Sequence, residues 1–333
     1  MRQNLIFLLR FGIAALVALI ASDRLADALD LRWKDVPNHS YLHVVRGFAD
    51  SPAEVDVAFF GTSSMRNAVA PEHLAQILAQ ELGRESECWN LAMPGATPEI
   101  LRYYTRELFT EKRPRILVLE AAPFLWDADR RAHPDSEVYW RWFAGVGELA
   151  SEGSRMRTRD IPEALHGLGW GIEALWKASG VVGDDFKEGA HHTAQFGGVY
   201  ELEELPMPRR QVIVSEQDPV REKLRVGGYA TSEVWADDLR EIAANCKELG
   251  IELVLVHQPF YVGLHEHFPA GAYDAYREWM GNLADELQLP LLDAHAEWDF
   301  DIEHYRDFIH YAPRGAAAFT ERLAEELLLP RLR

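Results

Sequence analysis

The sequence predicts an α/β protein with a five-stranded parallel sheet between two layers of helices. Short apolar runs rich in β-branched residues recur along the chain, and such runs are typical of strands covered on both faces. Segments with helical periodicity separate these runs, and this alternation predicts parallel strands, hence a three-layer sandwich of flavodoxin-like type. The predicted strands are Val55–Phe60, Glu87–Met93, Arg115–Glu120, Ile251–His257 and Leu289–Asp293.

The predicted helices have recognisable ends. The helix over residues 72–82 follows Pro71 and ends at Gly83, because glycine readily adopts the left-handed conformation that closes a helix. The helix from Pro98 to about Thr110 is capped by Thr97, and proline is favoured at the first helical position. Three later helices are predicted: one from a Thr231 or Ser232 cap to Leu249, one over Ala272–Leu287, and one over Ala316–Leu328.

The amino terminus is strongly apolar. Residues 5–9 and 11–21 are apolar and only Arg10 interrupts them, so the run approaches the minimum length of a membrane-spanning helix. We expect residues 1–22 to be an uncleaved membrane anchor, with a signal peptide or a buried helix as alternatives. Arg2 favours an amino terminus that stays inside, so the body would be exported to the periplasmic or extracellular face. Residues 23–53 are interpreted as a connector, and 54–330 as the globular domain.

The regular pattern is interrupted by a long insertion after the third predicted strand, at about residues 124–229. This region is rich in tryptophan and in turn-forming residues. Its tryptophans either pack the insertion onto the body or stack on a sugar or acyl chain. They are Trp126, Trp140, Trp142, Trp170 and Trp176.

Composition excludes several classes of function. The 333-residue chain has a formal net charge of −19, which argues against a nucleic-acid binder with a basic face. Cys88 and Cys246 are the only cysteines; buried free thiols are favoured over a disulfide. The acidic and histidine-rich run from Asp293 to His310 matches no closed zinc pattern, and no glycine-rich phosphate loop is present. We therefore expect neither a metal nor a cofactor.

A candidate catalytic set follows from where the strands end. Gly61 allows a sharp turn after the first strand, and this turn would deliver Ser63 and Ser64 to the carboxyl edge of the sheet, where ligands bind in open α/β folds. A serine hydroxyl needs a base, and the base needs an orienting group. Asp307 and His310 are three residues apart, so a helical turn would place both side chains on one face. They precede the last helix, at the same predicted edge.

Three blocks together resemble the SGNH (GDSL-like) hydrolases. They are Gly61-Thr62-Ser63, the segment from Asn90 to Gly95, and Asp307 to His310 followed by Gly315. The resemblance covers about 55–123 and 250–328. It implies that Ser63 is the nucleophile, His310 the base and Asp307 its orienter, with the backbone amides of Ser63 and Gly95 as oxyanion donors. Ser64 is the alternative nucleophile.

The chain departs from the family pattern in the third block, where Ala122 occupies the position of an oxyanion-binding asparagine. Membrane-anchored branches that modify cell-envelope polymers also depart here, and residues 123–126 resemble their Pro-x-Trp segment. Ser64, Asn90, Ala122 and His257 are candidates to line the pocket. The expected function is a serine esterase or O-acyltransferase acting on acyl esters of an envelope carbohydrate polymer. The alternative is a non-catalytic protein that binds a glycan or a membrane acyltransferase partner.

Overall fold

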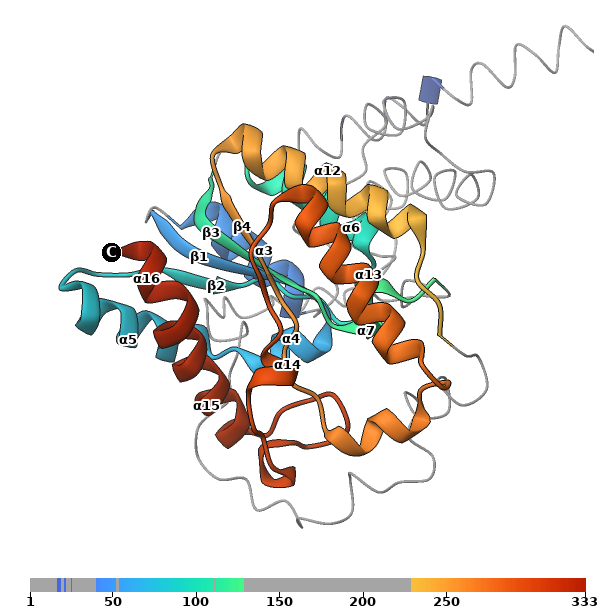
Figure 1. The fold of residues 1–333 in the computed structure, drawn as a ribbon. Helices are drawn as coiled ribbons and strands as arrows, with labels where there is room; N and C mark the ends of the chain where they lie inside the picture. The colour runs from blue at the N-terminus through green and yellow to red at the C-terminus, as the bar shows by residue number, and fades with distance from the viewer. Residues whose placement is uncertain are drawn as a thin grey trace, which may run out of the picture. The chain divides into compact units, whose positions relative to one another are not determined.

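The computed structural model describes residues 40–51, 54–110, 112–128 and 229–333, with four isolated positions nearer the amino terminus (Figure 1). The chain divides into two compact units. One comprises Met1–Leu42 and Pro134–His191, and the other comprises His43–His133 and His192–Arg333. The sheet belongs to the second unit, as do the helices around it from His43 onward.

The second unit contains a five-stranded parallel sheet, as the sequence predicts, and its strand order is β2-β1-β3-β4-β5. The chain runs outward from β1 in both directions, and this order creates a switch point between β1 and β3, where ligands bind in open α/β sheets. The strands are β1 (Val55–Phe60), β2 (Cys88–Asn90), β3 (Pro114–Glu120), β4 (Glu252–Val256) and β5 (Leu291–Leu292).

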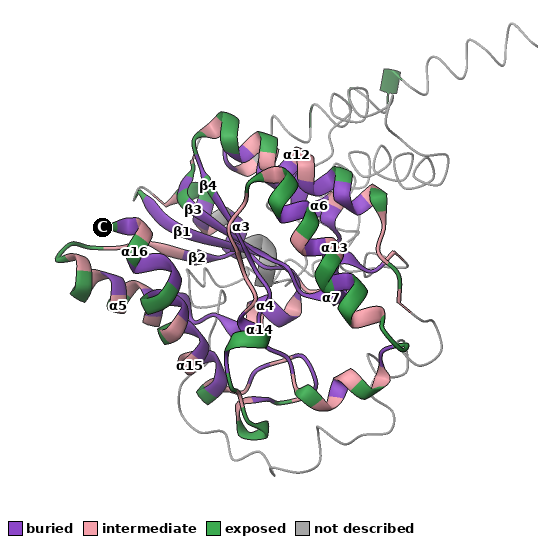
Figure 2. Ribbon diagram, in the orientation of Figure 1, coloured by how far each residue is buried: buried purple, intermediate pink, exposed green. Residues whose placement is uncertain are grey.

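The register aligns the carboxyl ends of the central strands. Phe59 pairs with Asn90 on one side and with Val118 on the other, and Val118 pairs in turn with Val254. Every residue of β1 is buried, which explains its continuous apolar sequence (Figure 2). The loops after β1, β3 and β4 therefore start close together.

One face of the sheet is covered by α5 (Pro71–Leu82), α15 (Pro313–Leu323) and α16 (Leu329–Leu332), which lie together in Figure 1. A π-helical stretch, η4 (Ala324–Leu328), joins α15 to α16. The α15 helix begins at Pro313, three residues before the predicted start at Ala316, because proline is well accommodated in the first turn of a helix. Their apolar side chains share one core with the inward residues of β1, β3 and β4.

The opposite face is covered by α3 (Ser40–Asp50), α6 (Pro98–Leu108) and α12 (Glu233–Leu249), and α13 (Ala272–Leu287) packs on α12. Phe60 of β1 stacks on Phe109 at 5.2 Å between ring centroids, and Phe48 of α3 contacts the same ring. The α3 helix lies within the predicted connector. Gly83 and Gly250 end α5 and α12 with φ angles of 66° and 71°, as expected.

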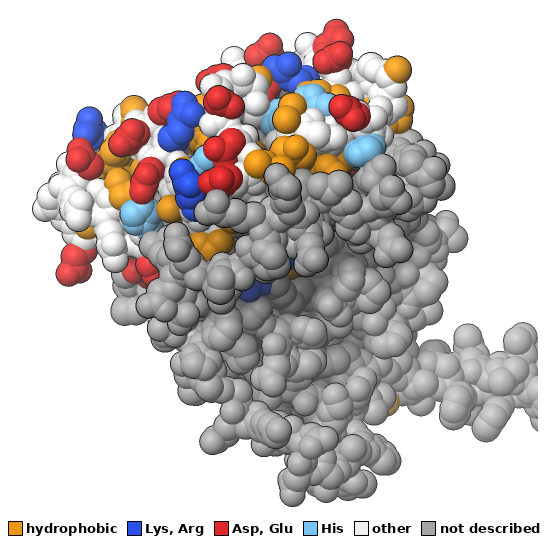
Figure 3. Space-filling model, turned by 90° about the horizontal axis from the view of Figure 1, so that it is seen from below, with side chains coloured by type: hydrophobic (Ala, Val, Ile, Leu, Met, Phe, Trp, Pro, Cys, Tyr) orange, Lys and Arg blue, Asp and Glu red, His pale blue; other side chains and the backbone are white. Residues whose placement is uncertain are grey.

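Both cysteines are free thiols, as predicted, although Cys88 is only half-buried. Acidic and basic side chains are interspersed over the described part of the face in Figure 3, with histidines between them. Within the residues that the structure describes, no helix combines the length and apolar character that a membrane crossing needs. Most of the predicted anchor and most of the predicted insertion lie outside the described residues.

Candidate active site

Ser63 is the first residue of α4 (Ser63–Ala68), directly after the turn that ends β1. Thr62 caps this short helix, and its hydroxyl accepts a hydrogen bond from the Ser64 backbone amide at 3.3 Å. Threonine is a favoured cap because its oxygen satisfies an amide that the helix leaves unpaired. The strand, turn and cap together place the Ser63 hydroxyl at the carboxyl edge of the sheet.

Gly61 is required for space rather than for its backbone angles, which corrects the sequence-based expectation. Its φ angle does not fall in the left-handed region. A β-carbon at this position would lie 2.4 Å from Oε2 of Glu120 and 2.7 Å from the β-carbons of Glu120 and Met65. Any larger residue would therefore push the turn away from β3.

His310 lies in a tight loop between η3 (Ile302–His304) and α15. An antiparallel bridge between Tyr305 and Tyr311 closes the loop, and the Arg306 amide donates to the His310 carbonyl at 2.8 Å. Oδ1 of Asp307 accepts the backbone amides of Ile309 at 3.0 Å and of His310 at 2.8 Å. Asp307 and His310 thus lie in a loop that the Asp307 carboxylate caps, and not in the expected helical turn. The three-residue spacing still brings their two side chains together.

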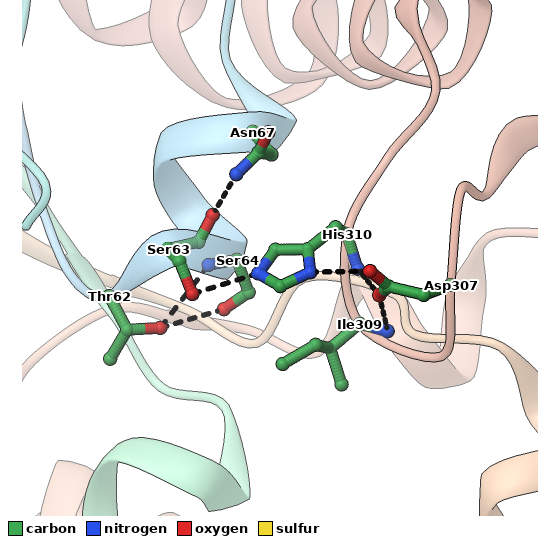
Figure 4. Close-up of polar contacts among 7 residues, drawn as sticks. All are labelled: Thr62, Ser63, Ser64, Asn67, Asp307, Ile309 and His310. Carbon is green, nitrogen blue, oxygen red and sulfur yellow. Dashed lines mark hydrogen bonds and ion pairs between the residues drawn. The ribbon is translucent and has the colours of Figure 1, made fainter. Parts of the chain in front are cut away.

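The structure brings Ser63, His310 and Asp307 into one hydrogen-bonded line (Figure 4). Nε2 of His310 lies 2.8 Å from Oγ of Ser63, and Nδ1 lies 2.7 Å from Oδ2 of Asp307. This is the arrangement of nucleophile, base and orienting group that activates a serine. The positions agree with the sequence-based hypothesis, while the catalytic roles themselves stay a prediction.

Asp307 is suited to orient the imidazole. Burial tends to raise the pKa of its carboxyl group, but the hydrogen bond and charge of His310 and the two loop amides outweigh burial and lower that pKa. Because the carboxylate accepts a hydrogen bond at Nδ1, the proton of a neutral His310 resides there. Nε2 is then left free to accept the proton of Ser63.

Ser64 faces away from this line, into the interior. Its side chain is buried, and its Oγ donates to Oε1 of Glu120 at 2.5 Å. Glu120 is completely buried at the end of β3 and also accepts from Thr62 and Gln258. The sequence analysis missed Glu120 and Gln258, although a charged residue that ends a buried strand is an available signal.

Asn90 supports α4 and does not line the site. Its Nδ2 donates to the carbonyls of Arg66 and Val69, at 3.1 and 3.2 Å, near the end of that helix, and its Oδ1 accepts from Ala92. Ala122 is buried among apolar side chains, so its methyl group supplies no hydrogen-bond donor in place of the family asparagine.

Gly95 lies in the loop after β2, with a φ angle of 72° that favours glycine. This loop is connected to the nucleophile turn, because the Met93 amide donates to the Gly61 carbonyl at 2.9 Å. No hydrogen bond among the described residues uses the Ser63 amide. The oxyanion roles of the Ser63 and Gly95 amides remain predictions.

His257 has a structural partner. It is buried at the end of β4, and its Nδ1 lies 3.1 Å from Oδ1 of Asp293, which Arg277 also contacts at 2.6 Å. Burial raises the pKa of Asp293, but the hydrogen bonds and charges of His257 and Arg277 prevail and lower it to about 2. The Asp293 carboxylate therefore holds His257, which the sequence analysis had offered as a candidate to line the pocket.

Two further histidines, which the sequence analysis did not single out, lie beside this pair. Nε2 of His265 is 2.6 Å from Nε2 of His295, and Nδ1 of His295 accepts the Phe260 amide at 3.2 Å. Burial, with the neighbouring histidines, lowers the pKa of His295 to about 3, and burial also lowers that of His265. Among the described residues, no group of three or more histidine, cysteine or acidic side chains is arranged to hold a metal ion.

No protein-family model matches the sequence, and no curated protein matches it either. Among solved structures, the chain is similar to a lipase/acylhydrolase from Enterococcus faecalis, with 12% identity and a TM-score of 0.41. The match covers 83% of this chain and 96% of that one. A variant acetyl xylan esterase from Geobacillus stearothermophilus has 12% identity and a TM-score of 0.39, over 82% of this chain and 95% of the other.

A GDSL-like lipase from Bacteroides thetaiotaomicron has 10% identity and a TM-score of 0.38, over 87% of this chain and 99% of the other. The functional assignment of this chain therefore rests on its own site, in which Ser63, His310 and Asp307 form one hydrogen-bonded line.

Proposed function

We propose that this protein is an SGNH-type serine esterase or O-acyltransferase that acts on acyl esters of a cell-envelope carbohydrate polymer. The observation that carries the proposal is the 2.8 Å contact between Oγ of Ser63 and Nε2 of His310, backed by the 2.7 Å contact of His310 with Asp307. A hydroxyl within hydrogen-bond reach of an oriented imidazole can be deprotonated as it attacks a carbonyl carbon.

The reaction proceeds in two halves. Nε2 of His310 takes the Ser63 proton while Oγ attacks the ester carbon; the tetrahedral intermediate then collapses, and His310 returns the proton to the departing alcohol. Ser63 now carries the acyl group. His310 next removes a proton from water or from a sugar hydroxyl, which attacks the acyl-serine. The Ser63 hydroxyl is regenerated with either a free carboxylic acid or a new ester as product.

Asp307 supports both halves of this cycle. Its carboxylate keeps the proton of neutral His310 on Nδ1 and stabilises the imidazolium that forms after proton transfer. Because the pKa of Asp307 is lowered below its ordinary value, the carboxylate stays ionised down to mildly acidic pH. Acid inactivation above pH ~4 would therefore have another cause.

The missing asparagine favours a slow or specialised reaction. Loss of one oxyanion donor typically costs on the order of a hundred- to a thousandfold in rate. Ala122 supplies no such donor, so the Ser63 and Gly95 amides would have to bind the oxyanion. The loss slows attack by water and by a sugar hydroxyl alike, so it does not by itself distinguish hydrolysis from transfer.

The proposal also includes an exported body held at the membrane by residues 1–22. The support is the apolar amino-terminal run in the sequence, with Arg2 before it. The substrate would then be an acylated carbohydrate of the envelope, and a membrane acyltransferase is the partner that this location suggests. Deletion of residues 1–22, followed by fractionation of the expressing cells, tests the anchor: the protein should move from the membrane fraction to the soluble fraction.

Hydrolysis of p-nitrophenyl acetate by the full-length chain tests the activity. We expect turnover by the wild type and its loss in Ser63→Ala and His310→Ala. Ser232→Ala is the matched control, because Ser232 precedes α12 and its side chain makes no capping hydrogen bond there. Equal rates in wild type and Ser63→Ala would refute the proposal. Addition of an oligosaccharide acceptor, with mass spectrometry of the sugar, separates transfer from hydrolysis.

The second candidate function is a non-catalytic binder of glycan or of a membrane acyltransferase. The absence of a donor at Ala122 favours it, whereas the Ser63–His310 contact favours the enzyme. An acyl-serine that forms from p-nitrophenyl acetate distinguishes the two, because a binder leaves Ser63 unmodified.

A further inference from the structure

We propose that Glu120 is a positioning residue for the reaction at Ser63, and this inference rests on the proposed function. The buried carboxylate fixes the residues on both sides of the nucleophile. It thereby holds the Ser63 hydroxyl toward His310 and leaves the Ser63 amide available to an oxyanion. Sequence reasoning gave Glu120 no role.

The position of Glu120 follows from the sheet. The register pairs Phe60 with Leu119, so the turn at Gly61 comes directly beside Glu120. The lack of a side chain at Gly61 is what admits the carboxylate, whose Oε2 would be 2.4 Å from a β-carbon there. The Glu120 carbonyl is fixed as well, because Nε1 of Trp126 donates to it at 3.1 Å.

The carboxylate contacts the residue before the nucleophile and the residue after it. Oε2 accepts the Thr62 backbone amide, and Oε1 accepts the Thr62 hydroxyl at 3.2 Å. Oε1 also accepts the Ser64 hydroxyl at 2.5 Å. Figure 4 shows the Ser63 hydroxyl facing His310, while the Ser64 hydroxyl lies near Thr62, a contact of 3.0 Å. Ser63 is thus held between two anchored neighbours.

Gln258, after the end of β4, completes the network. Its Nε2 donates to Oε1 of Glu120 and to Oγ of Ser64, both at 2.9 Å. The ends of β1, β3 and β4 are therefore joined beneath the nucleophile. Among the described residues, no cation pairs with Glu120, and its buried side chain is held by hydrogen bonds from Thr62, Ser64 and Gln258.

A buried carboxylate is a costly way to join strands, because apolar residues of similar volume often stabilise a fold as well or better. The benefit of a carboxyl group at this position is that it selects which backbone amides are engaged. Glu120 accepts the Thr62 amide, so that donor is already used and does not compete for an oxyanion. The next amide, that of Ser63, forms no hydrogen bond with any described residue and can donate to a developing oxyanion. The available Ser63 amide would thus make up in part for the oxyanion donor that Ala122 does not supply.

The test compares Glu120→Gln with wild type in the full-length chain. Glutamine keeps the shape, but its amide nitrogen cannot accept hydrogen bonds from Thr62 or Ser64. We expect kcat for p-nitrophenyl acetate to fall about 10- to 100-fold with KM nearly unchanged, because small misplacement of a reacting group has effects of this size. The NMR signal of the Asp307-bound His310 proton should persist, since that pair is not touched. A fold that merely loosened would lose it.

Glu241→Gln is the matched control. Glu241 is a carboxylate that pairs with Arg102 on the helices over the sheet, and its loss should leave kcat unchanged. Ser64→Ala serves if Glu120→Gln does not fold; it removes one donor and should lower kcat several-fold. Unchanged kcat in the variant that folds would overturn the inference.

A crystal structure of Glu120→Gln separates this inference from the proposed function. If the Ser63–His310 contact of 2.8 Å lengthens or breaks, Glu120 positions Ser63 even should the wild type prove inactive. If the contact is unaltered, the positioning role is refuted whatever the activity. An inactive wild type refutes the proposed function alone.

Discussion

Nε2 of His310 lies 2.8 Å from Oγ of Ser63, although 247 residues separate the two in the chain. The parallel sheet accounts for this meeting, because β1 and β5 both deliver their following loops to the same edge. The Tyr305–Tyr311 bridge and the Asp307 carboxylate then fix the loop that carries the imidazole.

Ser63 and Ser64 are expected to differ sharply on substitution. Ser63→Ala should lower the esterase rate by roughly 10⁴-fold or more, because the nucleophile is lost. Ser64→Ala should retain a measurable rate, since that hydroxyl is buried and bonded to Glu120. Steady-state kinetics with p-nitrophenyl acetate measures both. A reversed order of the two variants would identify Ser64 as the nucleophile.

Asp307→Asn should reduce kcat by about 10⁴-fold while the protein stays folded, because an amide can stabilise the wrong tautomer of His310. The 2.7 Å contact would persist with Nδ1 accepting rather than donating. Circular dichroism controls for folding, and kcat at neutral pH gives the effect. A loss of less than tenfold would mean that the imidazole is oriented without Asp307.

Gly61→Ala should destabilise the fold by about 1–3 kcal/mol and abolish activity, because the new methyl group would overlap Glu120 and Met65. Gly281→Ala is the matched control. It lies inside α13 with no atom near the added carbon, so the substitution should stabilise by about 0.5–1 kcal/mol. Urea denaturation measures both. Equal stability of the two variants would contradict the steric account.

Stability should fall as pH drops from about 6.5 toward 3. The pKa of His295 is lowered to about 3 in the fold, whereas an unfolded histidine has a pKa of about 6.5, so protons bind the unfolded state first in this range. The lowered pKa values of Asp293 and Asp307 act in the same direction, but only below pH ~4.

Urea denaturation between pH 7 and 5 tests this dependence. His295→Asn should flatten the slope by up to roughly one proton, because the titrating group is removed. An unchanged slope in His295→Asn would show that other groups set the acid sensitivity.

The sheet could be predicted because its strands are buried on both faces and therefore read as continuous apolar runs. The helix ends could be predicted from single residues. Gly83 and Gly250 adopt the left-handed conformation that closes a helix, and the Thr97 side chain caps the start of α6. The last helix was predicted to start at about Ala316, whereas α15 begins at Pro313, because proline is well accommodated at the first helical position.

The candidate triad could be predicted from strand ends and spacing, but its surroundings could not. Glu120 and Gln258 are close to Ser64 only in the folded chain, and no sequence periodicity relates residues on β1, β3 and β4. Asn90 and His257 were assigned to the pocket by position alone, whereas their partners are α4 carbonyls and Asp293. Side-chain direction at a strand end depends on such partners.

Mass-spectrometric mapping of a fluorophosphonate adduct on the full-length chain tests the central claim most directly. A single adduct on Ser63 is predicted, absent from Ser63→Ala and greatly slowed in His310→Ala. An adduct on another residue, equal labelling of Ser63→Ala, or no adduct on the folded wild type would contradict the claim that His310 activates Ser63.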